Sequence, residues 1–208
     1  MMLMTKRGPA LREHILWKAK EVFLENGFER TSMDEVARRA GTSKRSLYAH
    51  FHDKETLFLA VVDLVRGLFL DRLKTPGDYS NVPAEALTLF CGRYLEHALF
   101  EGAIRMCRVS MAEAERFPNG AANYFDVVYT QVHARLDEYL KKTFHLSHRA
   151  SGEAADRLLG RVLFPRFIRA LFGVEGSRRD IHPVAPAPDL DLKPIRRAVK
   201  ELLEDLAE

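Results

Sequence analysis

The stretch that decides the fold reads TSMDEVARRAGTSKRSLYAHF and occupies residues 31–51. Thr31 or Ser32 stands before a short run with acidic residues in its first turn, where carboxylates favour the positive end of a helix dipole. Gly41 ends that run, and Ser43 stands at the start of the next one. Two short helices joined by a tight turn with a small residue are typical of a helix-turn-helix, whose second helix enters the major groove of DNA.

Helical spacing divides this stretch into an inner and an outer face. The positions expected to pack inward are Val36, Ala37, Ala40, Leu47 and Phe51. The positions left on or near the outer face of the second helix are Lys44, Arg45, Ser46, Tyr48 and Ala49. A recognition helix usually reads bases with its N-terminal residues, so we expect Lys44 and Arg45 to face base edges.

The positive charge of the chain is concentrated around this stretch. Residues 1–58 hold 11 Lys and Arg against 8 Asp and Glu, whereas the other 150 residues hold 21 of each. The whole formal net charge of +3 therefore comes from the first 58 residues. Between residues 36 and 50 there are four bases and no acid, the asymmetry expected of a module that binds a polyanion.

The stretch resembles the TetR family of repressors, specifically over residues 10–60. The positions that carry the resemblance are Thr31, Asp34-Glu35-Val36-Ala37, Ala40-Gly41, Ser43, Leu47-Tyr48, His50-Phe51, Asp53-Lys54-Glu55 and Leu57. Thr42 departs from the pattern, since the family more often has an aliphatic residue there, which affects local packing. Beyond residue 60 the resemblance extends only to general helical organisation.

The resemblance implies a role for each matching position. The residues implied to hold backbone phosphates are Thr31, Ser32, Ser43, Tyr48, His50 and Lys54, while Lys44 and Arg45, with Ala49 beside them, are implied to face base edges. Phosphate contacts set register and affinity, and base contacts set sequence. Lys6 and Arg7 form a basic arm that either reaches a neighbouring groove or is a disordered tail, and His50 is equally consistent with a solvated position.

Apolar residues recur with helical spacing almost throughout, which predicts an all-α protein. We expect a three-helix DNA-binding domain at residues 1–56 and a larger helical domain for ligand binding and dimerisation at 57–208. A first helix should end at Gly27, Asp53 should cap a long fourth helix, and further helices are expected at 82–99, 102–116, 121–145, 151–172 and 193–206. Pro165 should kink or split the helix that contains it.

The C-terminal part is implied by the resemblance to sense a ligand and to dimerise. The candidate pocket residues are the large, soft or amphipathic side chains Phe90, Tyr94, Met106, Met111, Phe125 and Tyr129, although ordinary core is the favoured interpretation for any one of them taken alone. The candidate dimer interface is a stripe formed by Leu159, Gly160, Leu163, Phe167 and Leu171. That stripe is either domain core or subunit interface, and the resemblance favours the interface.

Composition and motifs weigh against other classes of protein. No metal-ligand spacing, glycine-rich phosphate loop or nucleophile elbow is present, so we expect no enzyme, no metal and no cofactor. No run is long and apolar enough for a membrane span or a signal peptide, and two cysteines suggest a reduced, cytoplasmic protein. A helical enzyme and a protein-interaction module without DNA binding stay as alternatives, which a lack of salt-dependent DNA binding would favour.

The expected function is a transcriptional regulator. One helix-turn-helix makes few base contacts, so a homodimer on double-stranded operator DNA with a palindromic sequence is expected. An unknown small-molecule effector would release the dimer from DNA by binding the other conformation more tightly. Repression by promoter occlusion is the simplest mechanism, but activation stays open.

Overall fold

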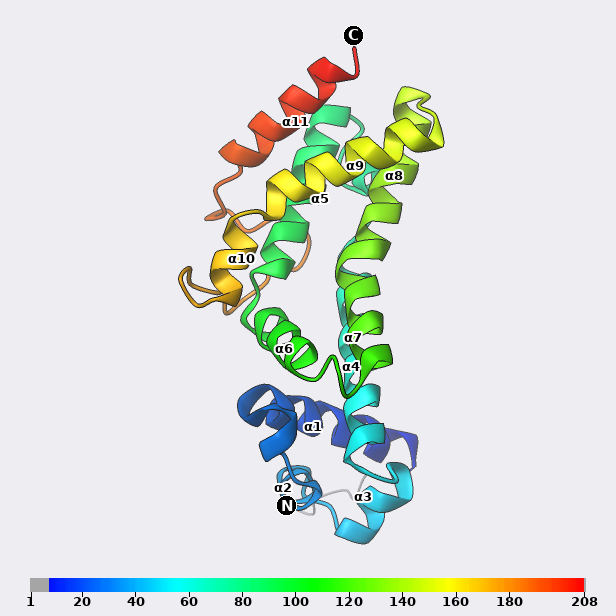
Figure 1. Cartoon of the computed structure of the whole chain (residues 1–208), viewed down its shortest axis with the longest axis vertical. Helices are drawn as coiled ribbons and strands as arrows, with labels where there is room; N and C mark the ends of the chain where they lie inside the picture. Colours follow the sequence, from blue (N-terminus) through cyan, green and yellow to red (C-terminus); the bar gives the residue numbers. More distant parts are fainter. Residues whose placement is uncertain (1–7, 208) are drawn as a thin grey trace. The chain divides into compact units, whose positions relative to one another are not determined.

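The computed structural model describes residues 8–207, apart from the side chain at position 127, so the predicted basic arm at Lys6 and Arg7 lies outside the described residues. Within this range the regular structure is helical, and extended pairing is limited to one isolated bridge between Phe100 and Arg178 (Figure 1). The prediction of an all-α protein with an N-terminal helix-turn-helix followed by a helical C-terminal domain is confirmed.

The chain forms two compact units that do not follow the chain order. Unit 1 contains residues 8–67 and 108–124, and unit 2 contains residues 68–107 and 125–207. The first boundary falls within the helix α4 (Lys54–Arg72), which therefore belongs to both units. The segment 108–124 joins unit 2 at both of its ends, although it packs with the N-terminal helices.

Unit 1 is built around the helices α1 (Pro9–Arg30), α2 (Met33–Arg39), α3 (Lys44–His50) and the first part of α4. The buried face of α1 is formed by the apolar residues Ile15, Leu16, Ala19, Val22 and Phe23. The rings of Phe23, Phe28 and Phe58 meet in this core, with centroids 5.2 Å apart for Phe23 and Phe58 and 5.3 Å apart for Phe28 and Phe58. Such edge-to-face pairs stabilise a core beyond the burial of their area.

Local sequence sets where these helices begin and break. Gly27 breaks α1 at φ 74° and ψ 177°, a conformation that residues with a side chain rarely adopt. The chain resumes one further turn to Arg30, so the predicted end at Gly27 is a break rather than the end. Ser32 and Ser43 cap α2 and α3, and Asp53 Oδ1 accepts the Thr56 amide at 2.7 Å, as expected for a cap of α4.

Unit 2 is a bundle with an internal core contributed by most of its helices. Its elements are the end of α4, a 3₁₀ turn η1 (Pro76–Asp78), α5 (Pro83–Ala98), part of α6 (Glu101–Ala112), a π-helical turn η2 (Asp126–Thr130), α8 (Gln131–Phe144), α9 (His148–Leu163), α10 (Arg166–Leu171) and α11 (Lys193–Asp205). In this bundle α9 packs against α5, α8 and α11, and α11 also packs against α5 (Figure 1).

Three of the predicted C-terminal helices differ in detail from the structure. The helix predicted over 102–116 ends at Ala112. The helix predicted over 121–145 begins earlier, as α7 (Pro118–Phe125), and continues through the π-helical turn into α8. Pro165 splits the helix predicted over 151–172 into α9 and α10, which confirms the expected break.

A buried charge pair fastens the segment before α11 to α5. The side chains of Arg93 and Glu96 are both 0% exposed and pair at 2.6 Å. Arg93 also donates to the carbonyl of His182 at 2.7 Å, and Glu96 accepts the His182 amide at 2.9 Å. The same segment packs close to α5 at Gly92, where an added Cβ would lie 2.9 Å from Pro186 Cγ. A glycine is required there by contact rather than by backbone angle.

Two further properties of residues 8–207 bear on function. No helix in this range has both the length and the apolar character needed to cross a membrane. In the same range, no group of three or more His, Cys, Asp or Glu side chains is arranged to hold a metal ion.

Candidate nucleic-acid interface

The turn between α2 and α3 positions the outer face of α3. Gly41 lies at φ 61°, where a glycine is favoured, and the Thr42 amide donates to the Ala37 carbonyl at 3.0 Å. The predicted inward residues Val36, Ala37, Ala40, Leu47 and Phe51 are all buried, each at 6% exposure or less. The inner face is thus fully used for packing, and the opposite face of α3 stays available.

The outer face of α3 carries the residues predicted to read bases. Lys44, Arg45 and Ala49 are exposed, and Tyr48 is 49% exposed. His50 is only half-buried and lies beside the ring of Phe51. A helix with a basic first turn and an exposed tyrosine one turn later has the side chains that major-groove recognition and phosphate contact require.

Ion pairs compensate part of the positive charge in the run of four bases between residues 36 and 50. Arg38 donates to Glu35 at 2.6 Å, and Arg39 pairs with both Glu35 and Glu25. The Arg38 hydrogen bond is the main cause that holds the pKa of Glu35 below its ordinary value. Arg38 and Arg39 are therefore compensated by carboxylates that lie outside the acid-free run of the sequence.

The two bases at the start of α3 differ from each other. Lys44 Nζ lies 2.6 Å from Asp34 Oδ2, but both side chains are more than half exposed, so this pair contributes little stability and can open. Within residues 8–207, Arg45 is the one base of the four in the run whose side chain has neither a hydrogen bond nor an ion pair. Its guanidinium is the uncompensated charge on the outer face of α3.

The hydroxyl residues at the helix starts have separate roles. Thr31 is 3% exposed and donates its hydroxyl to the Gly27 carbonyl at 2.7 Å, so its side chain is turned into unit 1. Ser32 is exposed, and its Oγ accepts the Glu35 amide at 3.2 Å. Ser43 is also exposed and accepts the Ser46 amide at 3.1 Å. Ser32 and Ser43 can reach a phosphate without a change in the fold, whereas Thr31 cannot.

Lys54 has internal partners that the sequence does not reveal. Its Nζ donates to the carbonyls of Phe28 at 3.0 Å and Glu29 at 3.2 Å, and lies 4.3 Å from the centre of the Phe28 ring. These carbonyls belong to the last turn of α1, so Lys54 ties the start of α4 to the end of α1. A phosphate contact by Lys54 would compete with these interactions.

The segment 108–124 adds a contact that the sequence gives no signal for. The Phe117 ring packs edge-on against Phe28 at 4.8 Å and tilted against Phe58 at 5.8 Å. The Arg116 guanidinium covers the Phe28 ring at 4.8 Å and pairs with Glu29 and Glu55. The N-terminal helices are thus held together partly by residues from the second half of the chain.

The predicted pocket residues fall into different environments. Phe90, Tyr94 and Met106 are 0% exposed, and the Tyr94 hydroxyl donates to the Val128 carbonyl at 2.7 Å. Tyr129 is half-buried and donates to Asp156 at 3.1 Å. The remaining two are largely exposed, Met111 at 63% and Phe125 at 61%. The two exposed side chains are also in different units, Met111 in unit 1 and Phe125 in unit 2.

The predicted dimer stripe is mainly internal. Leu159 is 0% exposed and belongs to the core of unit 2, while Leu163, Phe167 and Leu171 are partly buried against that core and Gly160 is exposed. A neighbouring set of apolar side chains faces outward instead. This set, the α10 patch, consists of Phe164 at 67%, Ile168 at 41%, Phe172 at 81% and Val174 at 63% exposure.

Comparisons with known proteins agree with this geometry. The family model described as bacterial regulatory proteins, tetR family, matches residues 15–61. The model described as the AefR-like transcriptional repressor, C-terminal domain, matches residues 85–185. The transcriptional regulator TcmR of Streptomyces glaucescens is 26% identical over 97% of this chain and 88% of its own length.

Other relatives match more locally or in fold. The transcriptional regulator QacR of Staphylococcus aureus is 36% identical over 31% of this chain, and the match spans about a third (34%) of QacR itself. A crystal structure of a TetR-family regulator from Mesorhizobium loti superposes with a TM-score of 0.76 at 23% identity, covering 97% of both chains. At this level of sequence identity, the superposition is evidence for a shared fold alone.

The helix-turn-helix with its basic outer face, followed by a helical second unit, defines a DNA-binding transcriptional regulator. Both family models apply to this chain, one to each of its two parts, and the full-length relative has the same class. The chain belongs to the TetR family of transcriptional regulators.

Proposed function

We propose that this protein is a homodimeric repressor that binds a palindromic operator in the cytoplasm and is released by a small molecule, rather than an enzyme. The uncompensated guanidinium of Arg45 on the exposed face of α3 is the observation that carries the DNA-binding part. An arginine in this position suits the bidentate recognition of guanine in the major groove. The match to a C-terminal domain described as that of a transcriptional repressor supports repression over activation.

The roles that we propose for the other predicted site residues follow from how exposed their side chains are. Ser32, Ser43 and Tyr48 would hold phosphates, and Lys44 would exchange Asp34 for DNA. Thr31 stabilises the end of α1 from inside, and Lys54 acts by holding α4 against α1. His50 is half-buried and would contact the backbone only at its exposed edge.

The test of base reading needs an operator, which selection of bound fragments from genomic DNA would supply. Arg45→Ala should then cost about 1–3 kcal/mol per half-site and relax base preference at one position. Arg149→Ala is the charge-matched control, because Arg149 is an exposed arginine of unit 2 that pairs with Glu153. Equal operator affinity of parent and Arg45→Ala would contradict the proposed docking.

The α10 patch is the proposed core of the dimer interface, in place of the more buried stripe around Leu159. Phe164, Ile168 and Phe172 follow one another at a spacing of four residues, and a run of large exposed apolar side chains is characteristic of subunit contacts. Phe172 is 81% exposed, so Phe172→Glu should leave the fold intact and shift sedimentation equilibrium toward the monomer. Val184→Glu, at a valine that is 63% exposed but outside the patch, is the control. A Phe172→Glu protein that stays dimeric would reject this interface.

Segment 108–124 is the proposed link between ligand binding in unit 2 and the release of DNA by unit 1. It packs on Phe28 and Phe58 of unit 1 but is joined to unit 2 at both ends, so a ligand that rearranges unit 2 would pull on it. The effector must bind the DNA-free state more tightly for the equilibrium to move. A screen of small molecules for thermal stabilisation, followed by operator titration, should find a compound that both raises Tm and weakens DNA binding. Stabilisers that all leave operator affinity unchanged would contradict ligand release.

A further inference from the structure

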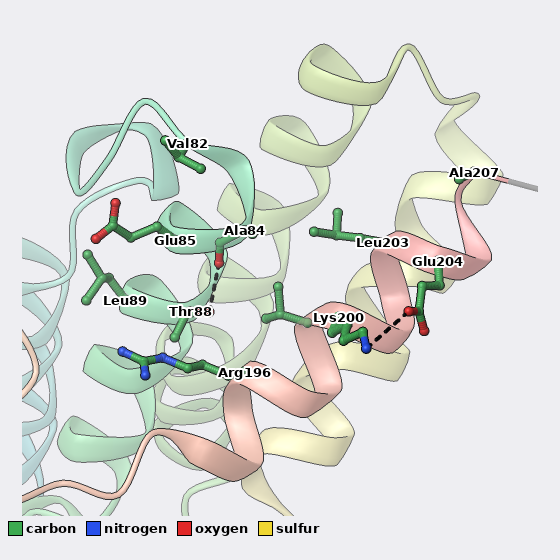
Figure 2. Close-up of a pocket in the computed structure, with 11 residues that line it drawn as sticks. Val82, Ala84, Glu85, Thr88, Leu89, Arg196, Lys200, Leu203, Glu204 and Ala207 are labelled. Atoms are coloured by element: carbon green, nitrogen blue, oxygen red, sulfur yellow. Dashed lines mark hydrogen bonds and ion pairs between the residues drawn. The ribbon is translucent and has the colours of Figure 1, made fainter.

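An apolar groove, open to solvent, runs between α5 and α11 in unit 2 and has a volume of about 640 Å³ (Figure 2). Its lining residues come from these two helices and the turns beside them, and include Val82, Leu89, Arg196, Val199 and Leu203. A volume in this range is typical of sites for small molecules. None of the residues predicted to bind ligand or DNA lines this groove.

The walls of the groove are apolar side chains that the fold does not cover. Val82 is 58% exposed at the entrance to α5, and Leu89 and Leu203 are half-buried on facing helices. Val199 is 1% exposed and lies at the base of the groove. A ligand that covers apolar surface of this kind removes it from water, which favours binding.

The ionisable side chains in the groove are unequally compensated. Lys200 Nζ lies 3.6 Å from Glu204 Oε1, and Glu85 accepts the Ser80 hydroxyl at 2.7 Å. The Arg196 side chain has no hydrogen bond or ion pair with any residue in the range 8–207. Figure 2 shows its guanidinium extending from α11 toward α5 on one side of Leu89, with the Glu85 carboxylate on the other side.

The polar surface next to this guanidinium is limited. Thr88 donates its hydroxyl to the Ala84 carbonyl at 2.7 Å, so this hydroxyl is left as an acceptor and does not compete for an anion. An arginine at the edge of an apolar groove matches a carboxylate in both charge and planar shape, because two of its N–H groups can donate to the two carboxylate oxygens.

We propose that the α5–α11 groove binds an amphipathic monocarboxylate. The apolar body of the ligand lies against Val82, Leu89 and Leu203, and its carboxylate pairs with Arg196. The proposal concerns binding to unit 2 and does not require that this ligand release DNA, so it stands or falls separately from the proposed function.

Isothermal titration of the full chain with decanoate, without DNA, tests the proposal. Decanoate should bind, and Arg196→Ala should weaken binding at least tenfold. Arg197→Ala is the matched control, because Arg197 is the next residue of α11, is exposed and does not line the groove. Val82→Glu should also weaken binding, because it places a second anion on the apolar wall at a site that is already exposed.

Ligands of equal chain length test the role of the charge. Decanol and decylammonium should bind at least tenfold more weakly than decanoate to the parent protein. Any of three results would overturn the proposal: no decanoate binding at millimolar concentration, decanoate binding that Arg196→Ala leaves unchanged, or decylammonium binding as tight as that of decanoate. The third result would assign the site to Glu85 and to cationic ligands instead.

Discussion

A buried histidine should make the stability of this protein depend on pH in a specific window. His97 is 2% exposed in α5, its Nε2 has no partner among the described residues, and its ring meets the Phe69 ring edge-on at 5.4 Å. Burial is the main cause that lowers the pKa of His97 from 6.5 to about 3, and the charges of Arg93 and Arg72 add to it. The imidazole is therefore neutral in the folded protein across most of the acidic range.

The sign and size of the effect follow from linkage. Between pH 6.5 and pH 3 the unfolded chain binds a proton at His97 that the folded chain does not, so the free energy of unfolding falls as the pH falls. Well above pH 6.5 neither state is protonated there, and the full stability is present. Lowering the pH from 7 to 5 should cost about 2 kcal/mol per chain through this residue alone.

The assay is urea unfolding followed by circular dichroism at pH 7 and pH 5, at one fixed protein concentration. His97→Gln keeps a polar side chain but cannot titrate, so the parent should lose about 2 kcal/mol more than this variant between the two pH values. Other titrating groups are common to both proteins and cancel in the difference. Equal losses would refute the assignment of a neutral, buried imidazole at His97.

Three further changes should lower stability for different reasons. Glu96→Ala leaves the guanidinium of Arg93 buried without its carboxylate and should cost about 3–5 kcal/mol in urea unfolding; a cost below about 1 kcal/mol would mean that water reaches the pair. Gly27→Ala forces a side chain into the conformation at φ 74° and should cost about 1–3 kcal/mol, and an unchanged midpoint would show that the break in α1 relaxes easily. Phe117→Ala removes a half-buried ring from Phe28 and should cost about 1–3 kcal/mol and weaken operator binding, whereas parent-like values would remove segment 108–124 from the proposed release route.

The sequence was most informative where local rules decide the structure. Hydroxyl and carboxylate caps at Ser32, Ser43 and Asp53 mark the starts of three helices, and Gly41 marks the turn between two of them. These signals act over a few residues and do not depend on the rest of the chain. The inner face of the helix-turn-helix could therefore be predicted residue by residue.

Partners that lie far apart in the sequence could not be predicted in the same way. The sequence run with four bases and no acid looks uniformly positive, yet Arg39 is neutralised by Glu25, 14 residues earlier in the chain. Lys54 matches the family pattern for a phosphate contact, but its ammonium is engaged by carbonyls more than 20 residues away. Partners at such separations depend on how helices pack, which periodicity does not specify.

The C-terminal part shows the same limit for apolar residues. Leu159 and Phe172 both fall within the helix predicted over 151–172, but the first is in the core and the second is on the surface. The break at Pro165 changes the direction of the chain between them, so a single helical stripe across residues 159–171 does not exist. Which apolar face is left over for a partner becomes visible only when the helices are assembled.

The central claim is that the outer face of α3 binds DNA, and the salt dependence of operator affinity tests it most directly. Each phosphate that the protein neutralises releases counterions, so the logarithm of the association constant should fall linearly with the logarithm of the salt concentration, by about 0.9 for each phosphate contact. In Arg45→Ala the operator affinity should fall by about 1–3 kcal/mol per half-site at every salt concentration, because a base contact is lost. A slope near zero in the parent, or equal operator affinity in both proteins, would contradict the account.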